Sequence, residues 1–216
     1  MIFDYKKKYK DLYLPKETPM VIDVPKMNFI MVDGAGDPND PEGEFNHAIE
    51  VLYGLSYTIK MSYKKDKDIP GFFQYVVPPL EGLWWMKDED NMDFTQKDQF
   101  MWTCMIRQPE FVTREVFQWA MEEMAKKKPN LDLSKARLQE FQEGLCVQAL
   151  HIGPYDDEGE TVAKITDYIH GNGYQHDMGS KLPDGMVRHH HEIYLSDPRK
   201  AKPEKMKTVI RHPIKK

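Results

Sequence analysis

The chain has 216 residues, of which 40% are hydrophobic, and its formal net charge is −5 at pH 7. These values suit one larger globular domain or two small units that share a core, and the negative charge argues against a general nucleic-acid binder. No apolar run approaches the ~18 residues of a membrane span, and the N-terminus lacks the apolar stretch of a signal peptide. The two cysteines, Cys104 and Cys146, lie far apart, so we expect a cytoplasmic protein without a disulfide framework.

Residues 1–25 are expected to form an N-terminal extension, because prolines interrupt regular structure at three places in it. Tyr5, Tyr9 and Tyr13 recur every four residues, which predicts a short helix with one buried face. The lysines between these tyrosines then form a solvated face rather than a nucleic-acid site.

The first half of the chain predicts a strand, a helix and two further strands. The string MNFIMVDGAGDPND (27–40) is typical of a strand that ends at its glycines and proline. Apolar residues keep helical spacing from residue 44 to about residue 63. The aromatic string GFFQYVVPPLEGLWW (71–85) is extended because its paired prolines forbid a helix, and FMWTCMIRQP (100–109) is the next strand.

The second half repeats the same order. The string EGLCVQALHIGPY (143–155) predicts a strand, and residues 158–170 have helical spacing closed by glycines. Two more strands are expected at about 189–196 and 205–213.

The connection between the halves is less regular. An extra helix is predicted from about Thr113, a suitable N-cap, to Lys127. The pattern of residues 131–141 fits neither a helix nor a strand clearly.

We therefore predict an α+β fold made of two pseudo-symmetric strand–helix–strand–strand repeats, about 26–110 and 140–214, in one domain over residues 26–214. Both repeats are expected to join one antiparallel sheet, with helices on one face and a ligand cleft on the other.

A glutamate in a strand of each repeat indicates where this cleft lies. Alternation along 189–196 places Ile193 and Leu195 toward the helices, and Glu192 and Tyr194 toward the opposite face. Aligning PLEGLWW with HHEIYLS makes Glu81 the counterpart of Glu192, and the Arg-x-Pro strings align Arg107 with Arg211. We expect the two carboxylates to meet in the cleft.

Aromatic residues around these glutamates suit a flat ligand. We predict that Glu81, Trp84, Trp85, Trp102 and Tyr194 contact a hydrophobic or cationic aromatic small molecule. Which of Trp84 and Trp85 faces the cleft stays open, because a bulge near the paired prolines would exchange them. An open sheet face with two solvated glutamates is the alternative.

Longer strings carry a resemblance to a known family. ALHIGPYDDEGETVAKITDYI and HHHEIYLSDPRKAKPEKMKTVIRHPI resemble the GyrI-like small-molecule-binding family, and FIMVDGAGDPND with PLEGLWW resembles its stand-alone branch. The resemblance covers about residues 20–214. In multidrug-sensing transcription regulators the same module is the effector-binding domain, where a pocket glutamate meets cationic aromatic drugs, and Glu192 matches that glutamate. We recognise no helix-turn-helix segment, so we expect no role in nucleic-acid binding.

The resemblance also implies an activity, because relatives in the stand-alone branch hydrolyse cyclopropane-bearing, DNA-alkylating natural products. In such chemistry a base directs water onto the ring, and a donor meets the oxygen that becomes a phenolate. Glu192 is then the candidate base, and Tyr155 or Tyr194 the candidate donor. We expect a detoxifying hydrolase that needs no cofactor. The alternative is a non-catalytic binder that sequesters drugs or inhibits a protein partner such as gyrase.

Two other motifs carry little weight. The run His189–His191 invites a metal site, but no third ligand is evident, so we predict no metal. The string DGAGD (33–37) does not open the helix that a phosphate-binding loop requires.

Overall fold

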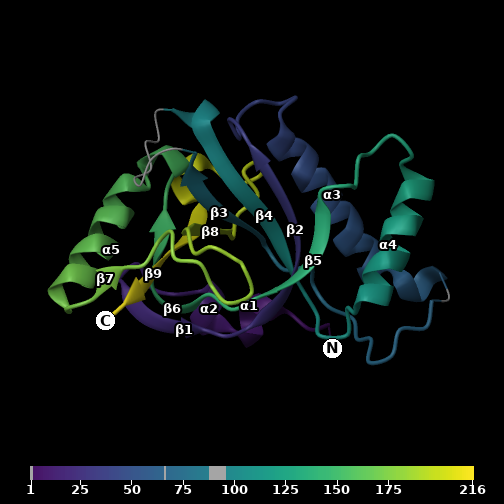
Figure 1. Cartoon of the computed structure of the whole chain (residues 1–216), viewed down its shortest axis with the longest axis horizontal. Coiled ribbons are helices and arrows are strands. Elements are labelled where there is room, and N and C mark those ends of the chain that lie inside the picture. The colour runs from purple at the N-terminus through teal and green to yellow at the C-terminus, as the bar shows by residue number, and fades with distance from the viewer. Residues whose placement is uncertain (1, 66, 88–95) are drawn as a thin grey trace.

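One antiparallel sheet forms the centre of the molecule in the computed structural model, which describes residues 2–65, 67–87 and 96–216 (Figure 1). Along the sheet the strands follow the order β1-β6-β9-β8-β3-β4-β2-β5, and β7 pairs with β9. The strands are β1 (Met20–Val24), β2 (Met27–Ala35), β3 (Leu80–Met86), β4 (Phe100–Gln108), β5 (Ala136–Phe141), β6 (Gly144–Ile152), β7 (Gln175–His176), β8 (His190–Tyr194) and β9 (Lys207–Lys215).

The helices accompany this sheet as the sequence predicted, and the short helix expected from the tyrosine spacing at the N-terminus is divided into two. They are α1 (Tyr5–Lys8), α2 (Lys10–Tyr13), α3 (Glu44–Lys60), α4 (Arg114–Lys127) and α5 (Gly159–Gly171). Figure 1 shows α3 and α5 at opposite ends of the sheet, with α4 beside α3. The predicted N-cap of α4 is confirmed, because the Thr113 hydroxyl accepts a hydrogen bond from the Val116 amide. In the described part of the chain, no helix combines the length and hydropathy that crossing a bilayer requires.

Two repeats build the sheet, and the α+β fold class is confirmed. One repeat supplies β2, α3, β3 and β4, and the other supplies β6, α5, β8 and β9. They meet at the central pair of β3 with β8. Outward from this pair, the strand order β8-β9-β6 of one repeat matches the order β3-β4-β2 of the other. The edge strands β1 and β5 extend the sheet beyond the repeats, pairing with β6 and β2.

The register of the central pair corrects the predicted placement of the two glutamates. Gly82 lies opposite Glu192, and Glu81 lies opposite Ile193. Directly opposed residues share a face of an antiparallel pair, whereas successive residues alternate. Glu81 and Glu192 therefore point to opposite faces of the sheet and cannot meet in one cleft.

The positions of α3 and α5 also correct the prediction that the helices and the ligand cleft lie on opposite faces of the sheet. Ile165 and Ile169 of α5 pack on Ile210, which lies opposite Glu192 in the sheet. On the other side Phe45 of α3 contacts Trp84, which shares the face of Glu192. Both repeat helices thus lie on the Glu192 face, and the cleft lies between them rather than on a face without helices.

Two glycines with positive φ show which residues of the repeats correspond. Gly36 (φ 99°) follows the first strand of one repeat, and Gly153 (φ 146°) follows the first strand of the other. With these two aligned, the registers of β2 with β4 and of β6 with β9 make Trp102 equivalent to Thr208. Their neighbours across the sheet, Trp84 and Tyr194, are then equivalent too.

The same alignment gives the predicted pairs of residues new counterparts. Glu81 lies three residues before Trp84 in β3, and His191 lies three residues before Tyr194 in β8. The equivalent of Glu81 is therefore His191 rather than Glu192. Arg211 corresponds to Met105, because both lie three residues from the aligned pair Trp102 and Thr208, so the predicted match of Arg107 with Arg211 is also wrong.

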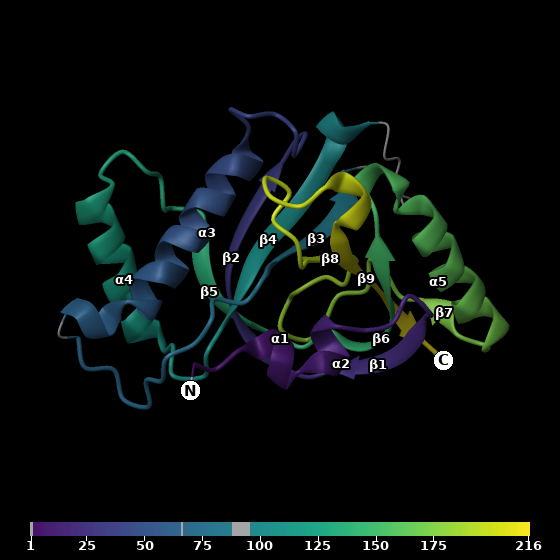
Figure 2. The ribbon, with the colours of Figure 1, turned by 180° about the vertical axis from the view of Figure 1, so that it is seen from behind.

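The face opposite α3 and α5 is covered by the N-terminal segment. Tyr5 and Tyr13 are buried, as their spacing predicted. The guanidinium of Arg107 lies 4.6 Å from the ring centroids of both Tyr5 and Tyr9, within the range of cation–π contacts. Figure 2 shows α1 and α2 beside β1 and β6. Residues 2–25 thus pack onto the sheet and supply one of its edge strands.

Candidate functional site

A large groove lies over the centre of the sheet, between α3 and the start of α5. Its volume is about 1390 Å³. Typical ligand pockets have volumes of ~300–1,000 Å³, so a ligand that fills a typical pocket would occupy only part of this groove. The residues at its centre are Phe45, Ile49, Tyr53, Leu80, Trp84, Tyr155, Glu158, Glu192, Tyr194 and Met206. A second hollow of about 660 Å³ near Glu17 and Glu160 is lined mainly by polar and charged side chains. The aromatic groove is the better candidate for a flat ligand.

Two buried glutamates lie together at the bottom of the groove. Glu192 comes from β8 and Glu158 from the residue before α5, and they are 7% and 2% exposed. Burial and the neighbouring charge of Glu192 raise the pKa of Glu158 well above its ordinary value. Glu158 is therefore the member of the pair whose protonated form is favoured at neutral pH.

Tyr194 and Trp84 form the wall beside this pair. The indole Nε1 of Trp84 donates a hydrogen bond to the Tyr194 hydroxyl at 2.9 Å. Gly82 makes room for the contact, because a Cβ at this position would lie 2.6 Å from Trp84 Nε1 and 3.1 Å from Tyr194 Oη. Burial, and next the charge of Glu192, raise the pKa of Tyr194 well above its ordinary value, so its hydroxyl keeps its proton.

Tyr155 completes the wall from the turn before α5. Its ring packs edge-on against Tyr194, with 5.6 Å between the ring centroids. Burial and the charge of Glu192 raise the pKa of Tyr155 to about 12. Both tyrosines are therefore hydrogen-bond donors near Glu192 over the whole neutral range.

Of the predicted aromatic contacts, Trp84 lies in the groove but Trp85 and Trp102 do not line it. The ring of Trp85 points to the other face of the sheet and stacks on His189, with centroids 4.2 Å apart and planes 13° apart. Trp102 is fully buried behind Phe45, whose ring meets it edge-on at 5.4 Å. The open choice between the tryptophans at 84 and 85 is thus resolved by the register, which gives the groove to Trp84.

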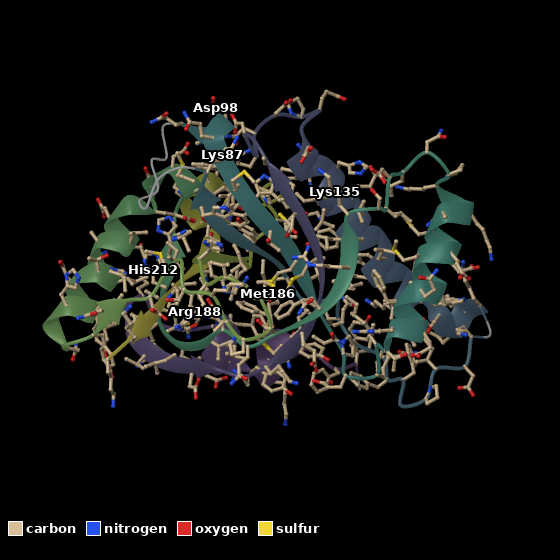
Figure 3. The ribbon with its side chains drawn as sticks, in the orientation of Figure 1. Lys87, Asp98, Lys135, Met186, Arg188 and His212 are labelled. Atoms are coloured by element: carbon tan, nitrogen blue, oxygen red, sulfur yellow. The ribbon has the colours of Figure 1, made fainter. Side chains whose placement is uncertain are left out.

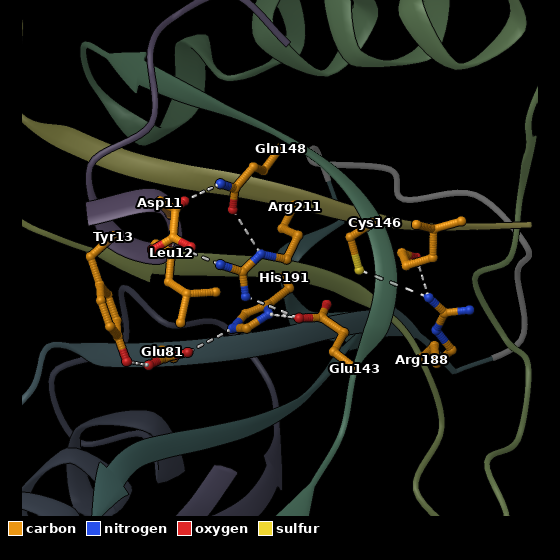
Figure 4. Close-up of polar contacts among 11 residues, drawn as sticks. Asp11, Leu12, Tyr13, Glu81, Glu143, Cys146, Gln148, Arg188, His191 and Arg211 are labelled. Atoms are coloured by element: carbon orange, nitrogen blue, oxygen red, sulfur yellow. Dashed lines mark hydrogen bonds and ion pairs between the residues drawn. The ribbon is translucent and has the colours of Figure 1, made fainter. Parts of the chain in front are cut away.

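Glu81 belongs to a buried ionic cluster on the face opposite the groove (Figure 4). His191 bridges two carboxylates there, with Nε2 at 3.1 Å from Glu81 and Nδ1 at 2.9 Å from Glu143. Arg211 reaches the same oxygen of Glu143 at 3.1 Å and also donates to the Leu12 carbonyl. These contacts correct the predicted role of Glu81 as a ligand contact, because its carboxylate pairs with His191 and, at 3.5 Å, accepts from the Tyr13 hydroxyl of the N-terminal segment.

The charges of this cluster fix its protonation. Burial opposes ionisation of Glu143, but the charges of His191 and Arg211 outweigh it and lower the pKa of Glu143 to about 2. Burial also opposes the charged form of His191, yet Glu143 and Glu81 outweigh it and raise its pKa. The lowered pKa of Glu143 and the raised pKa of His191 therefore both favour an ion pair between these two side chains.

The three consecutive histidines lie in three different environments. His189 stacks on Trp85, and burial lowers its pKa to about 4. His191 belongs to the ionic cluster. His190, between them, points to the groove face, where its Nε2 lies 3.0 Å from Glu192 and its Nδ1 lies 2.8 Å from His212.

Glu158, His190 and Glu192 offer ligand-type atoms within 4.8 Å of one another. A hydrogen bond accounts for the contact of His190 with Glu192, and a shared proton accounts for the contact of Glu192 with Glu158. We interpret the group as a proton-holding cluster, which is an arrangement suited to acid–base chemistry.

Comparison with known families agrees with the resemblance in the sequence. The model of the GyrI-like small-molecule-binding domain matches residues 17–215, which is most of the chain. The protein therefore belongs to the GyrI-like family.

Solved structures from Listeria innocua are similar over the whole chain. An uncharacterized conserved protein is 47% identical, with a TM-score of 0.91, and the match covers 99% of this chain and 100% of that one. A hydrolase encoded by lin2189 is 46% identical, with a TM-score of 0.88, and both chains are covered completely. The C-terminal domain of EcmrR shares the fold at 12% identity and a TM-score of 0.54, over 92% of this chain and 97% of that one. A search of curated proteins found no match.

Four of the residues predicted from the sequence line the groove, namely Glu192, Tyr155, Tyr194 and Trp84, but Glu158 and His190 were not predicted as members of the site. Glu158 stands in an acidic run that looks like an exposed helix start, and only the groove shows that its side chain turns inward. The signal for His190 was present, since residues 190, 192 and 194 share one face of a strand.

Proposed function

We propose that this protein is a detoxifying hydrolase that binds flat, electrophilic small molecules in the groove and opens a strained cyclopropane ring with water. The observation that carries the proposal is the pair of buried carboxyl groups of Glu192 and Glu158, of which Glu158 favours its protonated form, beneath a wall of aromatic rings. The similarity to a Listeria innocua hydrolase at 46% identity supports the same reading.

Water adds across one bond of the ring in this reaction. Its oxygen bonds to the methylene carbon of a spirocyclopropane while the carbon–carbon bond to that methylene breaks. The electrons of the broken bond move to the carbonyl oxygen of the conjugated ring, which becomes an aromatic phenolate. Glu192 accepts the proton that the attacking water loses, and the phenolate takes up a proton from a donor.

The side chains around Glu192 supply the hydrogen bonds, the donated proton and the ligand contact that the reaction also requires. Tyr155 and Tyr194 keep their hydroxyl protons, so each supplies a hydrogen bond to the oxygen that gains charge. Glu158 holds a proton near neutral pH and is the group that gives it to the phenolate. The ring of Trp84 supports a flat ligand beside them.

A second function is favoured by the same carboxylate. Glu192 lies near the rings of Trp84, Tyr155 and Tyr194, which is an arrangement that attracts organic cations. A protein that only sequesters cationic aromatic compounds would use these residues without a chemical step.

One experiment separates the two functions. The protein is incubated with a spirocyclopropane alkylating compound, and the small molecules are followed by mass spectrometry. A hydrolase produces a species heavier by one water in amounts that exceed the amount of protein. Recovery of unchanged compound, bound in a one-to-one complex, would show a sequestering protein instead.

A further inference from the structure

Four of the eight histidines form a line from the groove to the surface. His190 and His212 are buried at the centre of the sheet, His176 on β7 is half-buried, and His170 at the end of α5 is exposed. Successive ring centroids are 5.0 Å, 5.5 Å and 5.8 Å apart along this order. Figure 3 shows His212 on the side of the sheet that α5 covers.

The inner part of the line is hydrogen-bonded. His190 Nε2 lies 3.0 Å from Glu192 Oε1, and His190 Nδ1 lies 2.8 Å from His212 Nε2. Because a carboxylate accepts, His190 Nε2 carries the proton when Glu192 is charged, and His190 Nδ1 then accepts from His212 Nε2. This assignment leaves His212 Nδ1 as an acceptor that faces away from the groove.

The outer part of the line has two nitrogens that need a partner. The Nδ1 atoms of His212 and His176 are both buried without a hydrogen bond to the protein. Unpaired buried polar atoms are rare and call for a physical reason. The two rings are neighbours, with 5.5 Å between their centroids, and a proton that passes between them would use both nitrogens.

We propose that His190, His212, His176 and His170 form a proton-transfer path that connects Glu192 with solvent at the end of α5. The inference rests on the proposed function, in which Glu192 gains a proton from water while Glu158 gives one to the phenolate, and the path connects this pair of carboxyl groups with solvent. A ligand in the groove covers Glu192 from the front, so a path behind the sheet lets protons exchange while the groove is occupied.

Each passage balances in protons. From the assigned tautomers an inward passage comes first: a solvent proton reaches His212 Nδ1 by way of His176, the His212 Nε2 proton moves to His190 Nδ1, and the His190 Nε2 proton moves to the charged Glu192. One O–H bond and two N–H bonds break in solvent and along the path, and the same number form. The two inner histidines end in the opposite tautomer, and an outward passage restores them.

The charges near the path favour neutral rings. Burial, and then the neighbours His190 and His176, lower the pKa of His212 well below its ordinary value, and burial with His170 lowers the pKa of His176. A neutral imidazole accepts a proton at one nitrogen and releases one at the other, which suits it to relay protons.

Exchange of ring N–H protons with water tests the path without any substrate. Protein labelled with ¹⁵N-histidine is followed by NMR, and His191 is the internal reference because it is equally buried but bonded only to carboxylates. We expect the ring protons of His190 and His212 to exchange at least about tenfold faster than those of His191, whose exchange requires local opening. Equal exchange rates at all three histidines would overturn the proposal.

Variants at the outer end show which way the protons travel. His176→Leu interrupts the path at a half-buried position, so exchange at His190 and His212 should fall to the rate of His191. The matched control His47→Leu changes a half-buried histidine of α3, away from the path, and should leave the exchange rates as they are. Fast exchange that persists in His176→Leu would mean that protons enter through the groove, and the path would be rejected.

A turnover arm separates the path from hydrolysis. His176→Ala should slow exchange of the His190 and His212 ring protons at least about tenfold, and added imidazole should restore it by filling the vacated place, while turnover continues because Glu192 can pass its proton to Glu158. Failure to hydrolyse any spirocyclopropane would remove the proposed function and leave the exchange result standing. Fast ring exchange in His176→Ala with normal turnover would instead remove the path and keep the hydrolase.

Discussion

Trp84 and Tyr194 occupy equivalent positions in the two repeats and are hydrogen-bonded to each other across the central strands, at 2.9 Å. The pseudo-twofold relation thus brings two different side chains into one contact at the bottom of the groove. One member supplies an indole N–H and the other a hydroxyl, so divergence between the repeats has made an asymmetric site from a symmetric frame.

Removing the Tyr194 hydroxyl tests this contact. Tyr194→Phe leaves the buried Trp84 N–H without an acceptor, and an unpaired buried donor costs about 1–3 kcal/mol. We expect the free energy of unfolding, measured by urea denaturation, to fall by that amount. Tyr63→Phe changes an exposed tyrosine and is the matched control, with an expected change of less than about 0.5 kcal/mol. Equal losses in the two variants would show that the contact contributes nothing.

Gly82 is expected to tolerate no side chain. In Gly82→Ala the new Cβ would lie 2.6 Å from Trp84 Nε1, so the indole must shift at a cost of about 1–3 kcal/mol. The shift should also change Trp fluorescence and weaken ligand binding. Gly159→Ala is the control, because a Cβ there meets nothing within 4 Å and α5 gains a better helix former. Similar effects of the two substitutions would contradict the crowding at Gly82.

Acid stability should depend on Glu143. Its pKa is lowered from 4.5 to about 2 on folding, so its contribution is present above pH 4.5 and is lost as the pH falls toward 2. A shift of this size corresponds to about 3 kcal/mol for a fully buried group. Glu143→Gln should therefore lose about 3 kcal/mol at pH 7 and show a flatter fall in stability between pH 4.5 and 2. Urea denaturation at several pH values measures both, and parallel curves for the two proteins would contradict the assignment.

The fold was predictable from the sequence because each repeat carries its own periodicity, whereas the faces of the sheet were not. The predicted match of Glu81 with Glu192 spans 192 − 81 = 111 residues. In the observed register, residues of β3 and β8 that share a face of the sheet are separated by an even number of positions, so a match over an odd number places the two glutamates on opposite faces. A shift of one residue exchanges the two faces of a strand, so a plausible alignment of PLEGLWW with HHEIYLS placed Glu81 on the wrong side.

The edge strands show a second limit. In β5 the sequence ARLQEF has no clear alternation, and its partial burial along the strand explains why no pattern was visible. The short strand β1 lies between prolines in the predicted extension, and only its pairing with β6 reveals it. Glu158 and the histidine line depend on contacts between distant segments, which the sequence alone does not provide.

The proposed base gives the sharpest prediction. Glu192→Gln keeps the shape of the side chain and an oxygen that accepts from His190, but it removes the carboxylate. General-base catalysis contributes about 10²–10⁴-fold, so turnover of a spirocyclopropane compound should fall by that factor, measured by mass spectrometry of the hydrated product. Binding of a neutral ligand should change little, because no charge pair is lost, whereas cations should bind more weakly.

Two further glutamates serve as controls for this substitution. Glu158→Gln keeps the base but removes the donated proton, so turnover should fall while the hydrogen bond from His190 to Glu192 remains. Glu81→Gln changes the opposite face, so it should lower stability through the ionic cluster, and the folded protein should turn over at the wild-type rate. If Glu81→Gln abolishes turnover while Glu192→Gln does not, the base is the wrong glutamate. If none of the three changes affects turnover, ring strain and aromatic contacts alone open the ring, and the acid–base mechanism is wrong.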